Sequence, residues 1–375
     1  MGLKVALLYG GQSGEHEVSI MSACSVLEAV DKDRIEIFPI GIGKDGRWYP
    51  GLSPQTVKAS GTLAVRPLLP EAANHTLANE DLASLGHTGE RLLDNTSGFL
   101  LGALKEKVDV VFPLLHGPKG EDGTVQGLFE LAGIPYVGAG VAASAVGMDK
   151  ALMKAVFREK GIPIGDYRVY LRSELREDPE KIVGEIEEAL GYPCFVKPAN
   201  LGSSVGITKA HDKQELAAAL RTAADYDRKL VVEAFLDGRE VECAVLGNDL
   251  PEASVPGEII PGAEFYDYDD KYVHGKTKCI IPSALFVETT EEIRSLAIRA
   301  FKAIDCAGFA RVDFFVLHEN GRVLVNEINT IPGFTKISMY PKLWEASGLP
   351  YPKLIERLVA LARERYEDIK QNKLL

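Results

Sequence analysis

The chain contains the stretch Phe309-Ala310-Arg311-Val312-Asp313-Phe314-Phe315-Val316, followed by Val323-Leu324-Val325-Asn326-Glu327-Ile328-Asn329. Both stretches are apolar on both faces, which is typical of central strands in a sheet. Alternation along each strand places Arg311 on one face with Asp313, and Glu327 on one face with Asn329. Two carboxylates and an amide oxygen are ligands that suit Mg²⁺, and buried charges need such partners. The alternative is an internal Arg311–Asp313 salt bridge beside an unrelated Glu327.

The segment between these two strands decides their register. A two-residue turn at Asn320-Gly321 would leave Asp313 and Glu327 facing away from each other. A three-residue loop, Glu319-Asn320-Gly321, puts the two carboxylates directly opposite. Opposed carboxylates repel each other, so this register is expected only around cations. We therefore predict a three-residue loop with a positive φ at Gly321.

Length and charge limit the classes of function. The 375 residues suggest two or three domains, and 46% hydrophobic with 26% charged residues is typical of a globular protein. The net charge of −12, from 42 basic and 54 acidic residues, argues against nucleic-acid or membrane partners. No apolar run approaches the ~20 residues needed to cross a bilayer. The five cysteines are scattered, which predicts buried thiols in a reducing cytoplasm.

The N-terminal part alternates strand and helix signals. Strands are predicted at Val5–Tyr9, Ile35–Ile42, Val108–Leu115 and Ile134–Val137, with a helix at Val18–Val30. This order predicts a doubly wound parallel sheet covered on both faces. Ligands bind at the carboxyl ends of such strands, so Gly10–Glu15 and His116–Gly123 are expected to meet. Residues 51–104 form an elaborated connection with at least one helix.

After a helix at Asp149–Lys160 the pattern changes to one of paired strands, which favours an α+β unit. The predicted strands are Cys194–Lys197, Gly206–Lys209, Leu230–Glu233, Glu240–Leu246, Gly308–Leu317 and Arg322–Asn329. The predicted helices are Lys181–Leu190, Lys213–Ala224, Glu291–Ile304 and Tyr351 to about Lys370.

A glycine- and serine-rich loop between two of these strands is suited to phosphate. It reads Lys197-Pro198-Ala199-Asn200-Leu201-Gly202-Ser203-Ser204-Val205-Gly206. Its small residues let backbone amides and hydroxyls approach phosphate oxygens, and Lys197 supplies charge. A flexible hairpin tip is the alternative. The carboxylates of Glu233 and Glu240 could accept hydrogen bonds from adenosine, although most such side chains are simply solvated. Gly10-Gly11-Gln12-Ser13-Gly14 lacks the dinucleotide-binding spacing.

Five motifs together resemble the D-alanine–D-alanine ligase family. They are Gly10-Gly11-Gln12-Ser13-Gly14-Glu15-His16-Glu17-Val18-Ser19, His116-Gly117-Pro118-Lys119-Gly120-Glu121-Asp122-Gly123, Gly202-Ser203-Ser204-Val205-Gly206, Tyr266-Asp267-Tyr268-Asp269-Asp270-Lys271-Tyr272 and Asn326-Glu327-Ile328-Asn329-Thr330-Ile331-Pro332-Gly333-Phe334-Thr335. The resemblance implies a three-domain ATP-grasp fold. Its domains would be an N-terminal α/β domain at 1–140, a central subdomain at 141–238 and a C-terminal subdomain at 239–375.

The resemblance also implies the reaction, which is ATP-driven ligation of two D-alanines through an acyl phosphate for peptidoglycan synthesis. A D-alanine–D-lactate ligase of the vancomycin-resistance type is the alternative, which the pair Lys271-Tyr272 disfavours. A non-catalytic ATP-binding module would not need Arg311, Asp313 and Glu327 all intact. A kinase acting on a hydroxyl would not explain two anchors for amino acids. The family further implies a cytoplasmic homodimer.

Site residues are carried over from the family by motif. The catalytic set is Glu15, Ser203, Tyr272, Arg311, Gly333 and Ser338. Substrate contacts are implied for Glu15, His116, Ser204, Ser338 and Met339, with the choice between Ser203 and Ser204 left open and Ser203 favoured. ATP contacts are implied for Lys150, Lys197, Glu233, Phe235, Glu240, Lys271, Asn326 and Glu327. Two Mg²⁺ ions, with Mn²⁺ as a substitute, would be held by Asp313, Glu327 and Asn329. Phe265–Lys278 is interpreted as a lid that protects the acyl phosphate from water.

Overall fold

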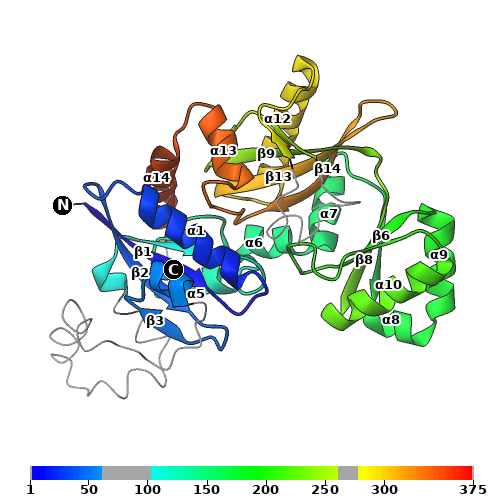
Figure 1. The fold of residues 1–375 in the computed structure, drawn as a ribbon, viewed down its shortest axis with the longest axis horizontal. Helices are drawn as coiled ribbons and strands as arrows, with labels where there is room; N and C mark the ends of the chain where they lie inside the picture. Colours follow the sequence, from blue (N-terminus) through cyan, green and yellow to red (C-terminus); the bar gives the residue numbers. More distant parts are fainter. Residues whose placement is uncertain (1, 61–101, 103, 261–277, 374–375) are drawn as a thin grey trace.

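The computed structural model describes residues 2–60, 102, 104–260 and 278–373. Its strands form three sheets, each with helices packed against it (Figure 1). Within the described ranges, no helix has both the length and the apolar character needed to cross a bilayer.

The N-terminal sheet has the strand order β3-β2-β1-β4. Its strands are β1 (Leu3–Gly10), β2 (Ile35–Ile42), β3 (Trp48–Pro50) and β4 (Val110–Leu114). The predicted parallel pairing is confirmed for β1 with β2 and β4. The sheet is not wholly parallel, however, because β3 adds an antiparallel edge.

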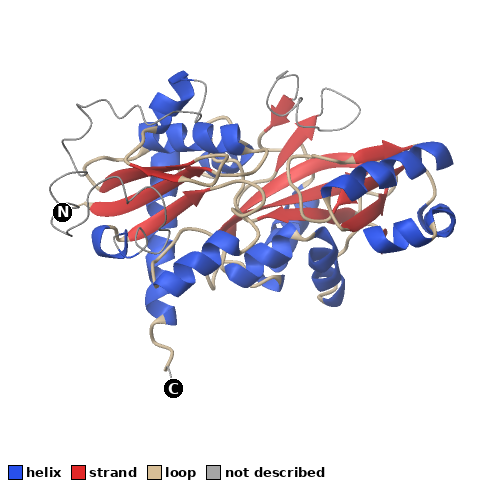
Figure 2. Cartoon of the chain, turned by 90° about the horizontal axis from the view of Figure 1, so that it is seen from below, coloured by secondary structure: helices blue, strands red, loops and turns tan. Residues whose placement is uncertain are grey.

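Helices cover both faces of this sheet, as predicted (Figure 2). Val5, Leu7 and Tyr9 point to one face and pack with α1 (His16–Ala29) and α14 (Tyr351–Ile369). Ala6 and Leu8 point to the other face and pack with α5 (Thr124–Ala132). The short helix α2 (Pro54–Ser60) contacts α1 and lies in the connection where a helix was expected.

The predicted fourth strand at Ile134–Val137 is wrong. Within the part of the chain that the structure describes, the segment makes one isolated parallel bridge, between Val111 and Tyr136. Pro135 has no N–H to donate, and the chain turns away at Gly138, where φ is 103°.

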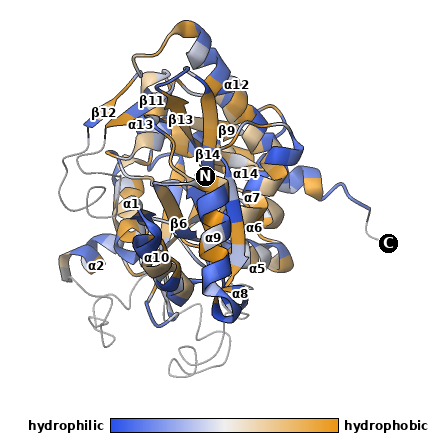
Figure 3. Cartoon of the chain, turned by 90° about the vertical axis from the view of Figure 1, so that its right-hand side faces the viewer, coloured by the Kyte–Doolittle hydropathy of each residue, from blue (hydrophilic) through white to orange (hydrophobic). Residues whose placement is uncertain are grey.

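The second sheet is antiparallel throughout, with the order β5-β8-β6-β7. Its strands are β5 (Tyr167–Leu171), β6 (Cys194–Pro198), β7 (Thr208–Ala210) and β8 (Lys229–Ala234). Its helices are α8 (Arg172–Glu177), α9 (Pro179–Leu190) and α10 (Lys213–Tyr226). Figure 3 shows polar and apolar residues on both α9 and α10, and the apolar ones form a core of their own with the sheet. This confirms the predicted α+β unit.

The third sheet has the order β12-β11-β9-β13-β14, with β10 paired to β9. Its strands are β9 (Gly238–Gly247), β10 (Glu252–Ala253), β11 (Gly257–Ile260), β12 (Lys278–Ile280), β13 (Gly308–Leu317) and β14 (Val323–Asn329). One face packs with α6 (Val141–Met148), α7 (Lys150–Glu159) and α12 (Val287–Ala303). The other face packs with α13 (Met339–Ala346) and α14.

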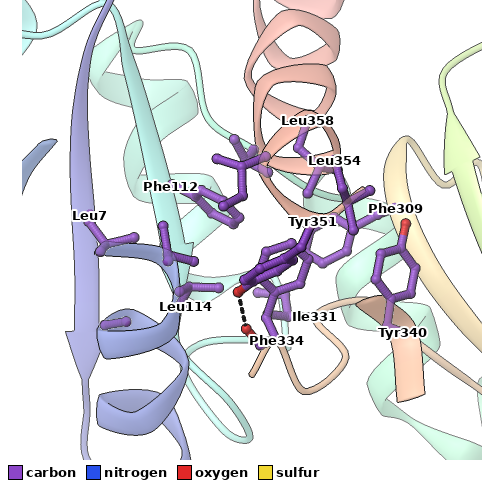
Figure 4. Close-up of a cluster of buried hydrophobic side chains, with 14 of the residues drawn as sticks. Leu7, Phe112, Leu114, Phe309, Ile331, Phe334, Tyr340, Tyr351, Leu354 and Leu358 are labelled. Atoms are coloured by element: carbon purple, nitrogen blue, oxygen red, sulfur yellow. Dashed lines mark hydrogen bonds between the residues drawn. The ribbon is translucent and has the colours of Figure 1, made fainter. Parts of the chain in front are cut away.

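The first and third sheets share one apolar core. Phe334 lies between Phe112 of β4 and Phe309 of β13, with ring centroids 5.6 and 5.8 Å away. Tyr351 donates a hydrogen bond of 2.5 Å to the Phe334 carbonyl (Figure 4). This core fixes the segment that follows β14. The domain borders at 140 and 238 stay a prediction.

The β13–β14 hairpin has the predicted register but not the predicted loop. Asp313 lies opposite Glu327, and the φ of Gly321 is 70°. The loop has four residues, because Leu317 donates to the carbonyl of Arg322. The register shift between Asp313 and Phe314 leaves Asn326 as an extra residue and restores the opposition of the carboxylates. β14 is also the last strand of its sheet rather than a central one, and among the described residues only Ile164 forms a bridge on its outer side.

We expect Gly321→Ala to lower the free energy of unfolding by about 1–2 kcal/mol, because a Cβ disfavours the left-handed region. The position has open space around it, so the cost is conformational rather than steric. Urea denaturation measures it. Gly184→Ala, at an exposed position of helix α9, is the matched control and should stabilise by about 0.5–1 kcal/mol. Equal stability changes in the two variants would contradict the strained turn.

Candidate active site

The two glycine-rich loops of the first sheet meet at the carboxyl ends of β1 and β4, as predicted. Ser13 Oγ donates to the carbonyl of His116 at 2.6 Å, and Lys119 Nζ donates to Gln12 Oε1 at 2.6 Å. Gly10 has a φ of 93°, and a Cβ there would lie 2.2 Å from the carbonyl oxygen of Ile42. The tight turn after β1 therefore requires glycine.

Glu15 lies between these loops and the loop after β6. Ser203 donates a hydrogen bond to Glu15 Oε1. A Cβ at Gly117 or Gly202 would come within 2.8 or 3.0 Å of Glu15 Oε2, so backbone closely surrounds this carboxylate. Ser203 and Ser204 both have left-handed φ, at 51° and 59°. The structure thus brings Ser203, the residue favoured from the sequence, to Glu15.

His116 is buried and connects the first sheet to the segment after β14. Its Nδ1 is 3.0 Å from the carbonyl oxygen of Ile331, and its Nε2 is 3.2 Å from Ser22 Oγ. Ser22 Oγ also accepts from the backbone N–H of Phe334 at 3.4 Å. Burial lowers the pKa of His116, but Glu121, Glu15 and the carbonyl of Ile331 together outweigh burial and raise the pKa.

Lys150, the first residue of α7, connects the loop after β6 with β14. Its Nζ donates to the carbonyl of Leu201 at 2.8 Å and lies 3.7 Å from Glu327 Oε2. The preceding Asp149 caps α7 by accepting from the N–H groups of Ala151 and Leu152. The ammonium of Lys150 is therefore held by the beginning of a well-capped helix.

Glu233 of β8 is buried between two lysines. Its Oε1 is 3.2 Å from Lys154 Nζ, and its Oε2 is 2.9 Å from Lys197 Nζ. Burial alone would raise the pKa of Glu233, but the two ammonium groups outweigh it and lower the pKa to about 2. Burial lowers the pKa of Lys154. The pKa of Lys197 is raised, because Glu233 and Glu327 together outweigh its burial.

On β13, Arg311 forms a two-bond salt bridge with Asp313, with both distances 2.7 Å. Its Nε also lies 3.1 Å from Glu242 on the neighbouring strand β9. Burial lowers the pKa of Arg311, but these carboxylates outweigh it and raise the pKa well above its usual range. Asn329 Nδ2 donates to Asp313 at 3.0 Å. The salt bridge proposed as the alternative to a metal site therefore exists, and Glu327 belongs to the same cluster.

The side chains of Asp313, Glu327 and Asn329 are suited to divalent cations that are also bound by the phosphates of ATP. Asp313, Glu327 and Asn329 come from two paired strands with the register that opposes the carboxylates. Among the described residues, no group of three His, Cys, Asp or Glu side chains is arranged to hold a metal by itself. Two carboxylates and one amide oxygen leave positions for phosphate oxygens, which is how Mg²⁺ usually binds.

The segment after β14 positions Ser338. Ser338 Oγ is 2.7 Å from Thr335 Oγ1 and accepts from the Thr335 N–H at 3.1 Å. A Cβ at Gly333 would lie 3.1 Å from the same oxygen. Met339, in contrast, packs into the core, where its Cε would contact a Cβ on Gly257 at 2.7 Å. Its side chain is thus held among apolar residues.

Phe235 directly follows β8, and Glu240 lies on β9. Phe235 is 41% exposed, and Lys209 Nζ lies 4.5 Å from its ring centre. Glu240 faces Phe315 and Ile259 in the sheet register. Lys271 and Tyr272, and almost all of the predicted lid Phe265–Lys278, fall outside the described residues.

Three polar residues of the site were missed by sequence reasoning. Lys154 lies four residues after Lys150, a spacing that puts both on one helix face. Glu242 lies two residues after Glu240 and therefore on the same face of β9. Ser22 carries no such signal, because its partner Phe334 is 312 positions away in the sequence.

Two family models match the chain. The N-terminal model of D-Ala-D-Ala ligase matches residues 4–139, and the C-terminal model matches residues 156–360. The chain belongs to the D-alanine–D-alanine ligase family. The enzymes of that name from Acetivibrio thermocellus and Ruminiclostridium cellulolyticum are 54% and 51% identical to it, over 97% and 98% of this chain and 97% of each relative.

Solved structures of this ligase family have the same fold. The D-alanine–D-alanine ligase from Coxiella burnetii superposes with a TM-score of 0.78 at 39% identity, covering 99% of this chain and 96% of that one. VanG D-Ala:D-Ser ligase from Enterococcus faecalis also gives a TM-score of 0.78, at 34% identity, covering 96% of this chain and 100% of that one. The predicted ATP-grasp fold is confirmed.

We expect Glu233→Gln to lower the free energy of unfolding by about 3 kcal/mol at pH 7, because two buried ammonium groups lose their partner. Since the folded pKa of about 2 lies below the unfolded value of about 4.3, this stabilisation is present above pH 4 and is lost as the pH falls toward 2. Urea denaturation between pH 3 and 7 should show the two proteins converging at low pH. The exposed control Glu180→Gln should change little, and a difference for Glu233→Gln that stays constant with pH would refute the assignment.

Proposed function

We propose how this chain performs the reaction of its family, the ATP-dependent, ADP-forming ligation of two D-alanines to D-alanyl-D-alanine for peptidoglycan precursors. One observation carries the proposal. The Leu201–Ser203 loop contacts Glu15 on one side, and on the other side it contacts Lys150, which pairs with Glu327. These contacts support the proposal that Glu15 anchors an ammonium group beside a cluster that binds phosphate and metal.

The chemistry of the reaction explains why an ammonium anchor and a phosphate-binding cluster are both needed. A carboxylate is a poor electrophile, so its oxygen first takes the γ-phosphoryl group of ATP, which gives an acyl phosphate and ADP. The amine of the second D-alanine attacks the acyl carbon and loses a proton. The tetrahedral intermediate collapses as phosphate leaves. Donors fixed in advance around the developing oxyanion lower this barrier most, and Arg311 with the N–H of Gly333 is proposed for that role.

The first D-alanine is proposed to place its ammonium against Glu15, with Ser203 and Tyr272 orienting that carboxylate. The surrounding loop backbone leaves the Glu15 side chain little freedom. Ser338 is proposed to hold the carboxylate of the second D-alanine, with His116 and Ser204 beside the substrates. Met339, whose side chain is buried, is proposed to contribute through its packing in the core.

ATP is proposed to bind between the second and third sheets. Lys150 and Lys197 would contact its phosphates, and Glu233 and Glu240 its adenosine. The remaining proposed contacts are with Phe235, Lys271, Asn326 and Glu327. Asp313, Glu327 and Asn329 would hold two Mg²⁺ ions, or Mn²⁺, which would neutralise phosphate charge. We also propose that the enzyme is cytoplasmic and forms a homodimer. Light scattering would measure the mass of the dimer.

The experiment that tests this function is phosphate release with D-alanine, L-alanine, D-serine and D-lactate offered in turn, with products identified by mass. We expect D-alanine to give dipeptide at the highest rate. The nucleophile must be a free amine, whereas D-lactate needs no such deprotonation, so higher pH should favour dipeptide in mixtures. If the product from mixtures of D-alanine and D-lactate is mostly depsipeptide between pH 6 and 9, the D-alanine–D-lactate alternative is correct.

Tyr272→Phe probes the lid in the same mixtures. Loss of one hydrogen bond in a closed site is worth roughly 1–3 kcal/mol, or about one to two decades in relative rate. The variant should therefore let D-lactate compete at low pH. A product ratio equal to that of the unaltered enzyme at every pH would leave Tyr272 with a packing role only.

We expect Glu327→Gln to abolish ligation without unfolding the chain, because it removes a charge shared by two cations. Activity is measured as phosphate release over a Mg²⁺ titration, and folding as the thermal midpoint. Glu319→Gln, an exposed change in the same hairpin, is the control and should retain activity. Near-normal turnover of folded Glu327→Gln at saturating Mg²⁺ would refute the metal assignment.

A further inference from the structure

Lys154 is a buried charged residue for which the reaction scheme above has no role. It lies on α7 and is 1% exposed. Its Nζ is 3.2 Å from Glu233 Oε1 on β8 and 3.3 Å from the carbonyl oxygen of Asn326 on β14. One ammonium group therefore contacts both sheets between which ATP is proposed to bind.

The partner on β14 is the residue that the bulge leaves out of the ladder. Asp313 faces Glu327 and Phe314 faces Val325, so Asn326 has no partner residue on β13. Lys154 donates to its carbonyl at this irregular point. A buried ammonium is costly unless its hydrogen bonds are made, so both contacts of Lys154 hold the bulge and Glu233 at a fixed separation.

The partner on β8 is held on both sides. Lys154 takes one carboxylate oxygen of Glu233 and Lys197 takes the other. An ionised carboxylate offers about four acceptor positions, so each oxygen keeps capacity for a further donor. A carboxylate held this way only accepts. It therefore favours a purine with an amino group at carbon 6 over one with an oxo group there.

We infer that Lys154 is a positioning residue that orients Glu233 toward the adenine amino group and sets this base-recognition point relative to the bulge beside Glu327. The inference rests on the proposed function, in which Glu233 contacts adenosine. Without Lys154, the ion-pair partner of Glu233 that remains among the described residues is Lys197, and the carboxylate turns toward that lysine. The preference for adenine then falls, and the contact of Lys197 with the ATP phosphates becomes weaker.

The test is Lys154→Met, which removes the charge but keeps most of the volume. Initial rates with D-alanine are measured with ATP and with inosine triphosphate, whose carbon 6 bears an oxo group. We expect KM for ATP to rise at least tenfold, kcat to change less than threefold, and the preference for ATP over inosine triphosphate to fall at least tenfold. Calorimetric binding of the two nucleotides without D-alanine should show the same loss of preference.

Lys229→Met is the matched control. Lys229 is on the same strand as Glu233 and forms a partly buried ion pair with Asp149 at the start of α7. Its loss should lower the thermal midpoint and leave the nucleotide preference unchanged. If Lys154→Met does not fold, Lys154→Gln keeps a donor at the site and should show a smaller loss of preference. An unchanged preference in folded Lys154→Met or Lys154→Gln overturns the inference.

A double-mutant cycle separates positioning from general damage. In a Glu233→Gln background, Lys154→Met should have no further effect on the nucleotide preference, because it acts through that carboxylate. Independent effects of the two changes on the preference overturn the inference. Failure of the proposed function is distinguishable, since the unaltered enzyme would then make no dipeptide from ATP and D-alanine.

Discussion

The opposition of Asp313 and Glu327 on paired strands is the constraint on which the candidate site depends. A four-residue loop alone would place Asp313 opposite Asn326, and the bulge at Asn326 moves Glu327 into that position. Without it, Glu327 would point to the apolar face. The repulsion between the carboxylates is offset by Arg311 on one side and Lys150 on the other. The bulge is therefore as necessary to the site as the charged residues themselves.

Apolar contacts join the first and third sheets at the site, and mainly polar contacts join the second sheet to it. The first and third sheets share the core around Phe334, which fixes the backbone between β14 and α13. The second sheet has a core of its own. Besides a small apolar cluster at the start of α7, it reaches the site through polar contacts, including those of Ser203 and Glu233. The position of the second sheet relative to the site therefore depends largely on polar contacts.

Sequence patterns predicted the elements whose periodicity is regular and missed those set by distant partners. β2 and β13 have the predicted bounds, because each is a mainly apolar run with polar residues or glycine at or next to both of its ends. The loop length was wrong because a bulge changes the period of two at a single residue, and nothing in Asn326 itself marks it. The carboxylate register was nevertheless right. Lys154 was missed because its partners, Glu233 and Asn326, lie far along the chain.

Charge balance explains why ATP and metal ions would bind together. The chain carries a net charge of −12, yet its buried cluster pairs cations with carboxylates. The cations are Lys150, Lys154, Lys197 and Arg311, and the carboxylates are Glu233, Glu242, Asp313 and Glu327. ATP alone would add uncompensated negative charge to a buried site, which is costly. The two proposed Mg²⁺ ions would offset the phosphates, so the loaded cluster would stay balanced. The basic residues thereby remain free to orient phosphate and carboxylate groups rather than only to neutralise them.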